Sequence, residues 1–318
     1  LQLVLGAGDL GAALVQQAFD GVVFTGSTEV AKLIEKRIAQ ADNDPVLIAE
    51  TGGQNVLVSD SSALPEQVVA DVLSSAFDSA GQRCSALRIL LLQEDVADHY
   101  YKMITEAINE FSLGDPRLLS TDIGPVIDQE AKQNLENHKA NMRKVARAYV
   151  ELEAPTNGHF VAPAVYLLDN LNQLQREVFG PILHIVRYKK ENLVNVLNEV
   201  NAKGYALTGG CHSRIRKQMD LVEKHLHCGN FYINRNIVGA VVGVQPFGGH
   251  GLSGTGPKAG GEFYLQRLTK TDRYYSQFGD ENTLGNAQPV LDSITGERNS
   301  LAYLPSEVAI LNGDLATS

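Results

Sequence analysis

Glu50 and Cys84 are the two residues of this sequence whose types and settings most clearly suggest covalent chemistry. Glu50 ends a short apolar run and precedes two glycines, and Cys84 closes the segment Gly-Gln-Arg-Cys. A cysteine thiolate can attack a carbonyl carbon and form a thioester. A carboxylate can activate the water that hydrolyses this thioester. If the two residues face one pocket, Cys84 would form the thioester and Glu50 would activate the water that hydrolyses it, which together oxidise an aldehyde.

Each of the two residues also has an ordinary structural interpretation, because most cysteines are small buried hydrophobes and a carboxylate at a strand end can simply face solvent. The setting of Cys84 favours reactivity. The adjacent Arg83 and free backbone N–H groups would stabilise a thiolate and lower its pKa, and the same N–H groups could hold an oxyanion. Glu50 lies where α/β sheets place ligands, and partial burial would raise its pKa toward neutrality. Cys211 and Cys228 lack such settings and are interpreted as structural.

Composition sets broad limits on the class of protein. The chain has 318 residues, 44% of them hydrophobic and 20% charged, as in globular proteins. A net charge of −10 argues against a nucleic-acid surface. Three cysteines without a CxxC spacing indicate neither a zinc site nor a disulfide framework, so we expect no metal and a reducing, cytoplasmic location. No apolar run approaches the roughly 18 residues that span a bilayer.

Strands and helices alternate along the chain, which predicts an α/β fold. Strands are predicted at 1–5, 22–25, 46–49, 87–92, 182–188 and 230–233. Helices are predicted at 10–19, 28–40, 64–79, 96–111, 128–147, 191–200 and 214–225. Residues 114–127 are predicted to form a loop. The turn-rich tail at 279–318 contains an apolar island at 308–311 that suggests a further ordered region.

Two glycine turns could each bind a phosphate group. Gly-Ala-Gly-Asp-Leu-Gly at 6–11 fits G-x-G-x-x-G between a predicted strand and a helix, with Glu29 near the place of a ribose-binding acid. Phe-Thr-Gly-Ser-Thr-Glu at 24–29 is a second strand-to-helix turn, in which Ser27 would cap the helix. Free N–H groups at such a helix start suit a pyrophosphate. Taken alone, each turn is equally compatible with no ligand.

Two later segments could contact a ligand. Glu177 could bind the diol of a ribose while Phe179 packs against it, although a plain turn explains both residues as well. Gly239 and Ala240 precede a glycine-rich stretch at 245–256, which indicates either close approach of the backbone to a ligand or a tightly folded loop.

Together these segments resemble the signature of the aldehyde dehydrogenase superfamily, in order and spacing, over roughly residues 1–270. The matching motifs lie at 24–29, 50–53 (Glu-Thr-Gly-Gly), 81–84, 177–181 (Glu-Val-Phe-Gly-Pro) and 246–249 (Pro-Phe-Gly-Gly). Within the superfamily the sequence is most similar to the L-glutamate γ-semialdehyde (pyrroline-5-carboxylate) dehydrogenase module of bacterial bifunctional proline-utilisation (PutA) proteins. The segments that carry this closer resemblance are 83–85, 114–127, 251–261 and 295–299.

The resemblance implies an aldehyde-dehydrogenase-like fold, with a partial Rossmann-type NAD domain followed by an α/β catalytic domain. Residues 1–52 would form the C-terminal part of the NAD-binding domain and 53–252 the catalytic domain. Residues 253–318 would form a return segment and the start of a C-terminal region. The resemblance also makes the turn at 6–11 a poorer candidate for the pyrophosphate, because in this superfamily that turn does not cradle it.

The resemblance also assigns roles. Cys84 matches the nucleophile and Glu50 the base that activates the deacylating water. The residues that match the NAD site are Gly26 and Ser27 at the pyrophosphate, Gly52, and Glu177 and Phe179 at the ribose. The residues that match the substrate site are Ser85, Gly239 and Ala240 at the substrate carboxylate, and Phe247 at its aliphatic chain. The implied reaction is the NAD-dependent oxidation of L-glutamate 5-semialdehyde to L-glutamate, the second step of proline catabolism.

Two residues of the family's site have no match in this sequence. These are an asparagine that completes the oxyanion hole and a lysine at the adenosine ribose, both upstream in the family. We therefore expect the chain to be a fragment that is inactive alone, with a proline dehydrogenase module upstream that would add FAD, and a homo-oligomeric full-length protein. The alternatives are an aldehyde dehydrogenase for another substrate class and a non-catalytic binding domain of the same fold.

Overall fold

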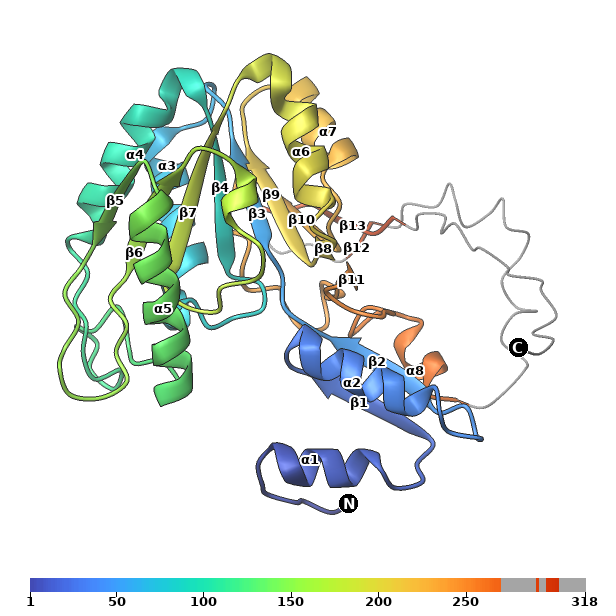
Figure 1. Cartoon of the computed structure of the whole chain (residues 1–318). Helices are drawn as coiled ribbons and strands as arrows, with labels where there is room; N and C mark the ends of the chain where they lie inside the picture. Colours follow the sequence, from blue (N-terminus) through green and yellow to red (C-terminus); the bar gives the residue numbers. More distant parts are fainter. Residues whose placement is uncertain (270–289, 292–295, 303–318) are drawn as a thin grey trace, which may run out of the picture.

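Two separate parallel sheets organise the chain, and the predicted α/β class is confirmed (Figure 1). The computed structural model describes residues 1–269, 290–291 and 296–302. The smaller sheet pairs two strands, β1 (Gly21–Thr25) and β2 (Val46–Glu50). The larger sheet has seven strands in the order β10-β9-β3-β4-β7-β6-β5, all parallel except that β5 runs antiparallel to β6. Its strands are β3 (Asn55–Ser59), β4 (Leu87–Gln93), β5 (Ala148–Glu151), β6 (Ala164–Leu168), β7 (Ile182–Tyr188), β9 (Thr208–His212) and β10 (Asn230–Ile233).

Helices cover both faces of the larger sheet. Helices α3 (Pro65–Phe77) and α4 (Glu94–Ile108) lie on one face, and α5 (Gln129–Val145), α6 (Leu193–Asn201) and α7 (Arg216–His225) on the other (Figure 1). Helices α1 (Gly8–Val15), α2 (Thr28–Ile38) and α8 (Tyr264–Arg267) accompany the smaller sheet (Figure 1). The remaining short elements are η1 (Asp78–Gly81), η2 (Leu171–Gln173), η3 (Lys190–Asn192), β8 (Tyr205–Ala206), β11 (His250–Gly251), β12 (Val290–Leu291) and β13 (Asn299–Ser300).

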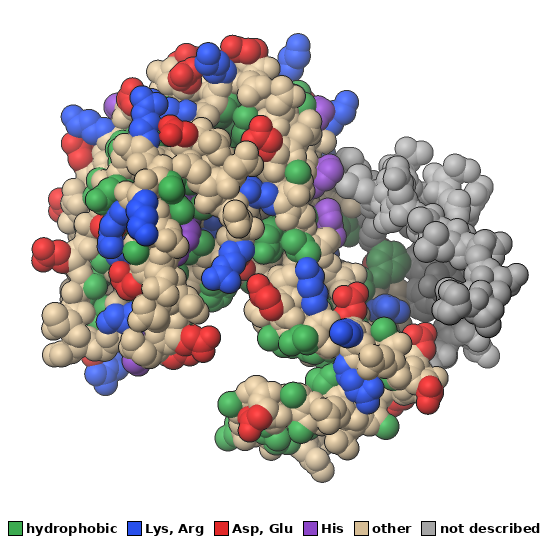
Figure 2. Space-filling model, in the orientation of Figure 1, with side chains coloured by type: hydrophobic (Ala, Val, Ile, Leu, Met, Phe, Trp, Pro, Cys, Tyr) green, Lys and Arg blue, Asp and Glu red, His purple; other side chains and the backbone are tan. Residues whose placement is uncertain are grey.

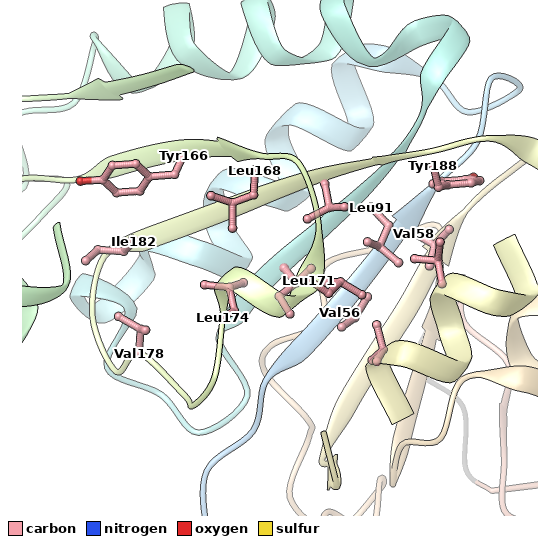
Figure 3. Close-up of a cluster of buried hydrophobic side chains, with 14 of the residues drawn as sticks. Val56, Val58, Leu91, Tyr166, Leu168, Leu171, Leu174, Val178, Ile182 and Tyr188 are labelled. Atoms are coloured by element: carbon pink, nitrogen blue, oxygen red, sulfur yellow. The ribbon is translucent and has the colours of Figure 1, made fainter. Parts of the chain in front are cut away.

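The central strands of the larger sheet are mostly apolar because both faces of the sheet are covered. Every residue of β3, β4 and β6 is buried. Val56 and Val58 of β3 pack with Leu91 of β4 and with Leu171 and Leu174 beyond β6, as Figure 3 shows. Burying each such side chain contributes roughly 1.5–3 kcal/mol. The larger sheet is therefore a rigid platform for the loops at its edges.

A segment at 252–255, which lies late in the chain, pairs with the end of β2. The Thr51 N–H donates to the Ser253 carbonyl at 3.0 Å, and the Thr255 N–H donates to the Ala49 carbonyl at 2.9 Å. Glu50 forms an antiparallel bridge with Gly254 between these two bonds. The end of β2 is thus fixed from both sides, by β1 and by a segment some two hundred residues later.

Several predicted elements match the structure and others do not. The strands predicted at 182–188 and 230–233 coincide with β7 and β10. The strand predicted at 1–5 is wrong: these residues are exposed, and among the described residues none pairs with them in a sheet. Strands β3, β5, β6 and β9 were not predicted. The glycines of β9 look like a loop in the sequence. The apolar island at 308–311 lies outside the described residues.

A Cβ on Gly210 of β9 would come within 2.5 Å of the Tyr232 carbonyl oxygen, so close packing and not a turn requires this glycine.

Charged side chains of both signs are interspersed on the face of the molecule shown in Figure 2. Among the described residues, no helix combines the length and the apolarity that a membrane crossing requires.

Three consecutive residues in the left-handed region reverse the chain between α3 and Cys84. Their φ angles are 57° at Ser79, 54° at Ala80 and 64° at Gly81. A non-glycine residue held there costs of order 1–3 kcal/mol, so the surrounding contacts must maintain the turn. A Cβ on Gly81 would come within 2.2 Å of the Gly180 carbonyl oxygen.

Gly81→Ala is therefore expected to destabilise the protein more than the same change at another positive-φ glycine. Gly260, with a φ of +75° and no atom within 4 Å of its Cβ position, is the matched control. Gly260→Ala should cost about 1 kcal/mol in free energy of unfolding from φ alone, and Gly81→Ala a further ~1–3 kcal/mol from the clash. Urea titration of both variants measures the difference, and equal midpoints would contradict the close approach at Gly81.

Candidate active site

A buried arginine, Arg88, holds the segment that carries Cys84. Arg88 is the second residue of β4 and its side chain is almost fully buried, at 2% exposed. Its Nη1 donates to the Gly81 carbonyl at 2.7 Å, and its Nη2 donates to the Arg83 carbonyl at 3.1 Å. These carbonyls flank the tight turn before Cys84, so the cation fixes the backbone on which the thiol sits.

The same guanidinium reaches a second segment, at 177–180. Arg88 Nη1 donates to the Gly180 carbonyl at 3.2 Å, and Nη2 pairs with Glu177 Oε1 at 3.3 Å. The Glu177 carboxylate also lies against the Gly53 N–H. A Cβ on Gly52 would come within 1.6 Å of Glu177 Oε2, so any other residue there would displace this carboxylate from Arg88. Burial raises the pKa of Glu177, although Arg88 and the Gly53 N–H oppose the rise.

Asn55, at the start of β3, ties the Cys84 segment to two strands of the larger sheet. Its Nδ2 donates to the Cys84 carbonyl at 2.7 Å and to the Ala86 carbonyl at 2.8 Å. Its Oδ1 accepts from the Thr208 N–H of β9 at 3.0 Å. One buried amide makes all three hydrogen bonds. It therefore aligns the amino ends of β3, β4 and β9 next to Cys84.

Cys84 is partly buried, and its thiol has a raised pKa. Burial is the largest cause, followed by the negative charge of Glu177, with a smaller effect from Glu50. The backbone N–H groups of Ser85 and of Cys84 itself act in the opposite direction by donating to the thiolate. The expected N–H donors are therefore present, and both carboxylates lie close enough to the sulfur for their charge to act on it.

The expectation that Arg83 lowers the pKa of Cys84 is wrong. Arg83 is exposed and its Nε donates to the Ser79 hydroxyl at 2.9 Å, away from the sulfur. The cation near the thiol is instead Arg88, and its guanidinium is paired with the Glu177 carboxylate. The thiol therefore stays protonated more readily than the sequence suggested.

Glu50 ends β2 with a buried carboxylate. Among the described residues, neither of its oxygens has a hydrogen-bond partner. Burial raises its pKa to about 7, while the nearby Gly249 N–H and the charge of Lys258 counter part of the rise. A Cβ on Gly248 would lie only 3.0 Å from Glu50 Oε1, and a Cβ on Gly254 only 3.2 Å from Glu50 Oε2. The two glycines therefore leave room for this carboxylate. A neutral-range, unpartnered carboxylate is what a general base requires.

The first turn of α2 and Glu177 approach one another across the two sheets. Ser27 caps the helix, with its hydroxyl accepting from the Val30 N–H at 3.2 Å, as predicted. Glu29 of the same turn adds to the rise in the pKa of Glu177 through its charge. Gly26 links this turn to the site, because its N–H donates to the Glu50 carbonyl at 3.2 Å. The backbone N–H groups at this helix start and the Glu177 carboxylate thus lie in one region, and a helix start of this kind favours an anionic group.

Phe179 presents its ring to the same region. The ring is 46% exposed, and the Arg88 guanidinium lies 5.3 Å from its centre. This contact supports one face of the ring and leaves the side chain partly open for a ligand. By contrast, the turn at 6–11 does not follow a strand, and α1 begins inside it at Gly8.

The four predicted substrate residues lie on two segments. Ser85 is buried next to Cys84, and its carbonyl accepts from the Thr208 hydroxyl at 3.1 Å. Phe247 pairs with Ala259, and a Cβ on the neighbouring Gly248 would lie 3.0 Å from the Glu50 carboxylate. Gly239 and Ala240 occupy the loop after β10, where Gly239 has a φ of +76° and open space at its Cβ position.

Sequence reasoning missed three residues of the site: Arg88, Asn55 and Lys258. One signal for Arg88 was present, since a lone charge inside the apolar strand Leu-Arg-Ile-Leu-Leu-Leu must have buried partners. Asn55 and Lys258 gave no such signal, because their partners are far away in sequence. Within the described part of the chain, no group of three His, Cys, Asp or Glu residues could hold a metal ion.

The chain belongs to the aldehyde dehydrogenase family, whose model matches residues 1–273. It is 54% identical over 282 residues to the bifunctional protein PutA of Escherichia coli (strain K12), an alignment that covers 84% of this chain and 21% of PutA. It is 36% identical over 251 residues to a 1-pyrroline-5-carboxylate dehydrogenase of Geobacillus sp. (strain WCH70), with 77% of this chain and 48% of that protein covered.

Two solved structures have the same fold. A crystal structure of a bifunctional proline utilization A (PutA) protein matches with a TM-score of 0.81 at 55% identity, over 83% of this chain and 27% of that one. A 1-pyrroline-5-carboxylate dehydrogenase from Thermus with bound NAD matches with a TM-score of 0.75 at 31% identity, over 82% of this chain and 52% of that one. The chain thus spans about a fifth to a half of the length of these relatives.

Removing the charge of Glu177 should lower the pKa of the Cys84 thiol. Because the carboxylate raises this pKa, Glu177→Gln should speed alkylation by iodoacetamide at pH values below the pKa of the wild-type thiol. Mass spectrometry of the labelled Cys84 peptide across a pH series gives the profile. Glu153→Gln, at an exposed glutamate, is the matched control. A profile that stays in place or moves to higher pH would contradict the arrangement.

Proposed function

We propose that this chain is the part of a longer enzyme that oxidises L-glutamate γ-semialdehyde to L-glutamate with NAD⁺, through a thioester on Cys84 that Glu50-activated water hydrolyses. The observation that carries the proposal is the Glu50 carboxylate. It is buried, has no hydrogen-bond partner among the described residues, has a pKa near 7, and acts by its charge on the Cys84 sulfur. A carboxylate kept in this state has no structural task of its own, but it suits proton abstraction from water.

Each residue has a definite part in the reaction. The Cys84 thiolate attacks the aldehyde carbon, and the N–H groups of Cys84 and Ser85 are available to the oxyanion that forms. Bound NAD⁺ supplies the acceptor for the hydride that leaves this carbon, which turns the adduct into a thioester. Glu50 then takes a proton from water, the resulting hydroxide attacks the thioester carbonyl, and the sulfur leaves as thiolate. The products are a carboxylate and the free enzyme.

The cofactor site proposed for NAD consists of residues from both sheets: Gly26, Ser27, Gly52, Glu177 and Phe179. The α2 start offers unpaired N–H groups to phosphate, and Glu177 offers a carboxylate to a ribose diol. The Thermus relative with bound NAD supports this assignment. This chain itself would not bind FAD. FAD would belong to a proline dehydrogenase module in the same polypeptide, a partner that the bifunctional PutA relatives suggest.

The substrate assignment rests on Ser85, Gly239, Ala240 and Phe247. Ser85, buried next to Cys84, and the backbone of a positive-φ glycine with open space at its Cβ position suit a carboxylate. The names of the relatives point to the same substrate class, because 1-pyrroline-5-carboxylate is the cyclised form of the semialdehyde. We further propose that residues 1–52 belong to the NAD-binding domain, 53–252 to the catalytic domain and 253–318 to a return segment and C-terminal region. A homo-oligomeric, cytoplasmic full-length protein completes the proposal.

Replacing the two catalytic residues should block different steps, measured as NADH formation by the full-length protein with glutamate semialdehyde. Cys84→Ala should abolish NADH formation altogether. Glu50→Gln should give one burst of NADH followed by turnover slower by roughly 10²–10⁴-fold, because the thioester still forms. Glu66→Gln, at an exposed glutamate, is the control. Activity retained in Cys84→Ala would exclude the mechanism, and equal rates with simple aliphatic aldehydes would exclude the substrate.

Lys258 should set the pH at which hydrolysis begins. Glu50 must be ionised to act, so the turnover number rises with pH through the carboxyl pKa near 7. The positive charge of Lys258 lowers this pKa. Lys258→Met should therefore move the rising limb of the pH profile of the turnover number to higher pH. Stopped-flow kinetics from pH 5 to 9 measure the limb, with the exposed Lys190→Met as control. A limb that stays in place or moves to lower pH would contradict the role of Lys258.

A further inference from the structure

The loop after β10 is tied to a segment far along the chain through one buried amide, that of Gln245. Its Oε1 accepts from the Val241 N–H at 3.0 Å, inside the loop. Its Nε2 donates to Asn299 Oδ1 at 2.9 Å and to Glu297 Oε2 at 3.4 Å. One side chain therefore connects the backbone next to Ala240 with residues 297–299.

Glu297 also holds the beginning of this loop. It forms an ion pair with Arg235 Nη1, and both side chains are only about a quarter exposed, at 25% for Arg235 and 29% for Glu297. The Arg235 guanidinium in turn lies 5.2 Å from the centre of the Tyr232 ring on β10. Glu297 therefore contacts both ends of the loop, Arg235 where the loop begins and Gln245 where it ends.

The segment that makes these contacts has local structure of its own. Strand β13, which contains Asn299, pairs antiparallel with β12, with Leu291 opposite Asn299. The ion pair of Glu297 and the amide hydrogen bond of Asn299 are both partly shielded from solvent, so they restrain the loop more than fully exposed contacts would.

The loop between these two ends needs such restraint. Gly239 and Gly243 both have positive φ, at +76° and +83°, and neither has an atom within 4 Å of its Cβ position. Glycines in open surroundings give a backbone many conformations. A loop whose N–H groups must converge on a carboxylate binds more tightly when those conformations are removed before the substrate arrives.

We propose that Glu297 and Asn299 are positioning residues that hold the loop at 237–245 ready for the substrate carboxylate, and so determine the preference for carboxylate-bearing aldehydes. The inference rests on the proposed function, in which Gly239 and Ala240 bind this carboxylate. Neither residue touches the reacting atoms; both act through Gln245, and Glu297 also acts through Arg235.

The test compares two substrates in the full-length protein. Glu297→Gln and Asn299→Ala should each raise the KM for glutamate semialdehyde by about tenfold and leave kcat nearly unchanged, because uniform binding is lost. Kinetics with propanal, which has no carboxylate, should not change. Arg298→Ala is the matched control, since this exposed residue lies between the two. Glu297→Asp should recover part of the affinity.

Hydrogen–deuterium exchange of the peptide covering 237–245 gives a second measurement that does not depend on the substrate. Exchange should be faster in Glu297→Gln and Asn299→Ala than in the wild type and in Arg298→Ala, with the melting temperature little changed. Unaltered exchange, or equal effects on both substrates, would overturn the inference. Faster exchange in a protein that does not oxidise glutamate semialdehyde would instead refute the proposed function and keep the role of the segment in holding the loop.

Discussion

The buried charge of Arg88 is the constraint on which the site depends. An unpaired guanidinium in the interior would cost several kcal/mol, so the surrounding backbone must supply acceptors for it. Those acceptors are the Gly81, Arg83 and Gly180 carbonyls and the Glu177 carboxylate. Pairing the two Nη groups of one cation thereby sets the position of the segment with Cys84 and of the segment with the proposed ribose-binding carboxylate.

Glu177 and Glu50 show how position decides the behaviour of similar groups. Both carboxylates are buried and both have raised pKa values. Glu177 is paired with a cation and a backbone N–H, so it is held in place. Among the described residues Glu50 has no ion pair, and the Gly249 N–H and the charge of Lys258 only partly offset the rise in its pKa, so its carboxyl can exchange a proton near pH 7. Both residues lie in glycine-flanked segments of the sequence. Only their contacts distinguish Glu177, which is held in place, from Glu50, the proposed base.

The sequence predicted the α/β class and most helices, because hydrophobic periodicity is local. The roles of Glu50 and Cys84 stay predictions, which rest on the chemistry of a strand end and of a glycine-flanked loop. It did not predict β9, since Thr-Gly-Gly-Cys-His has glycines that close packing requires and that look like a turn. It placed the wrong cation near Cys84, because neighbours in sequence are not neighbours in space: Arg83 points away, and Arg88 of the next strand approaches. Lys258 and Gln245 act across long separations that no local pattern records.

The segment at 252–255 has a consequence for how the molecule comes into being. The Thr28 hydroxyl bonds to the Leu252 carbonyl across 224 positions, and Glu50 lies next to Gly254. Such contacts close very long loops and form late in folding. During synthesis the smaller sheet therefore emerges from the ribosome long before the segment that completes it. The larger sheet can therefore hold Cys84 before the segment at 252–255 fixes the position of Glu50.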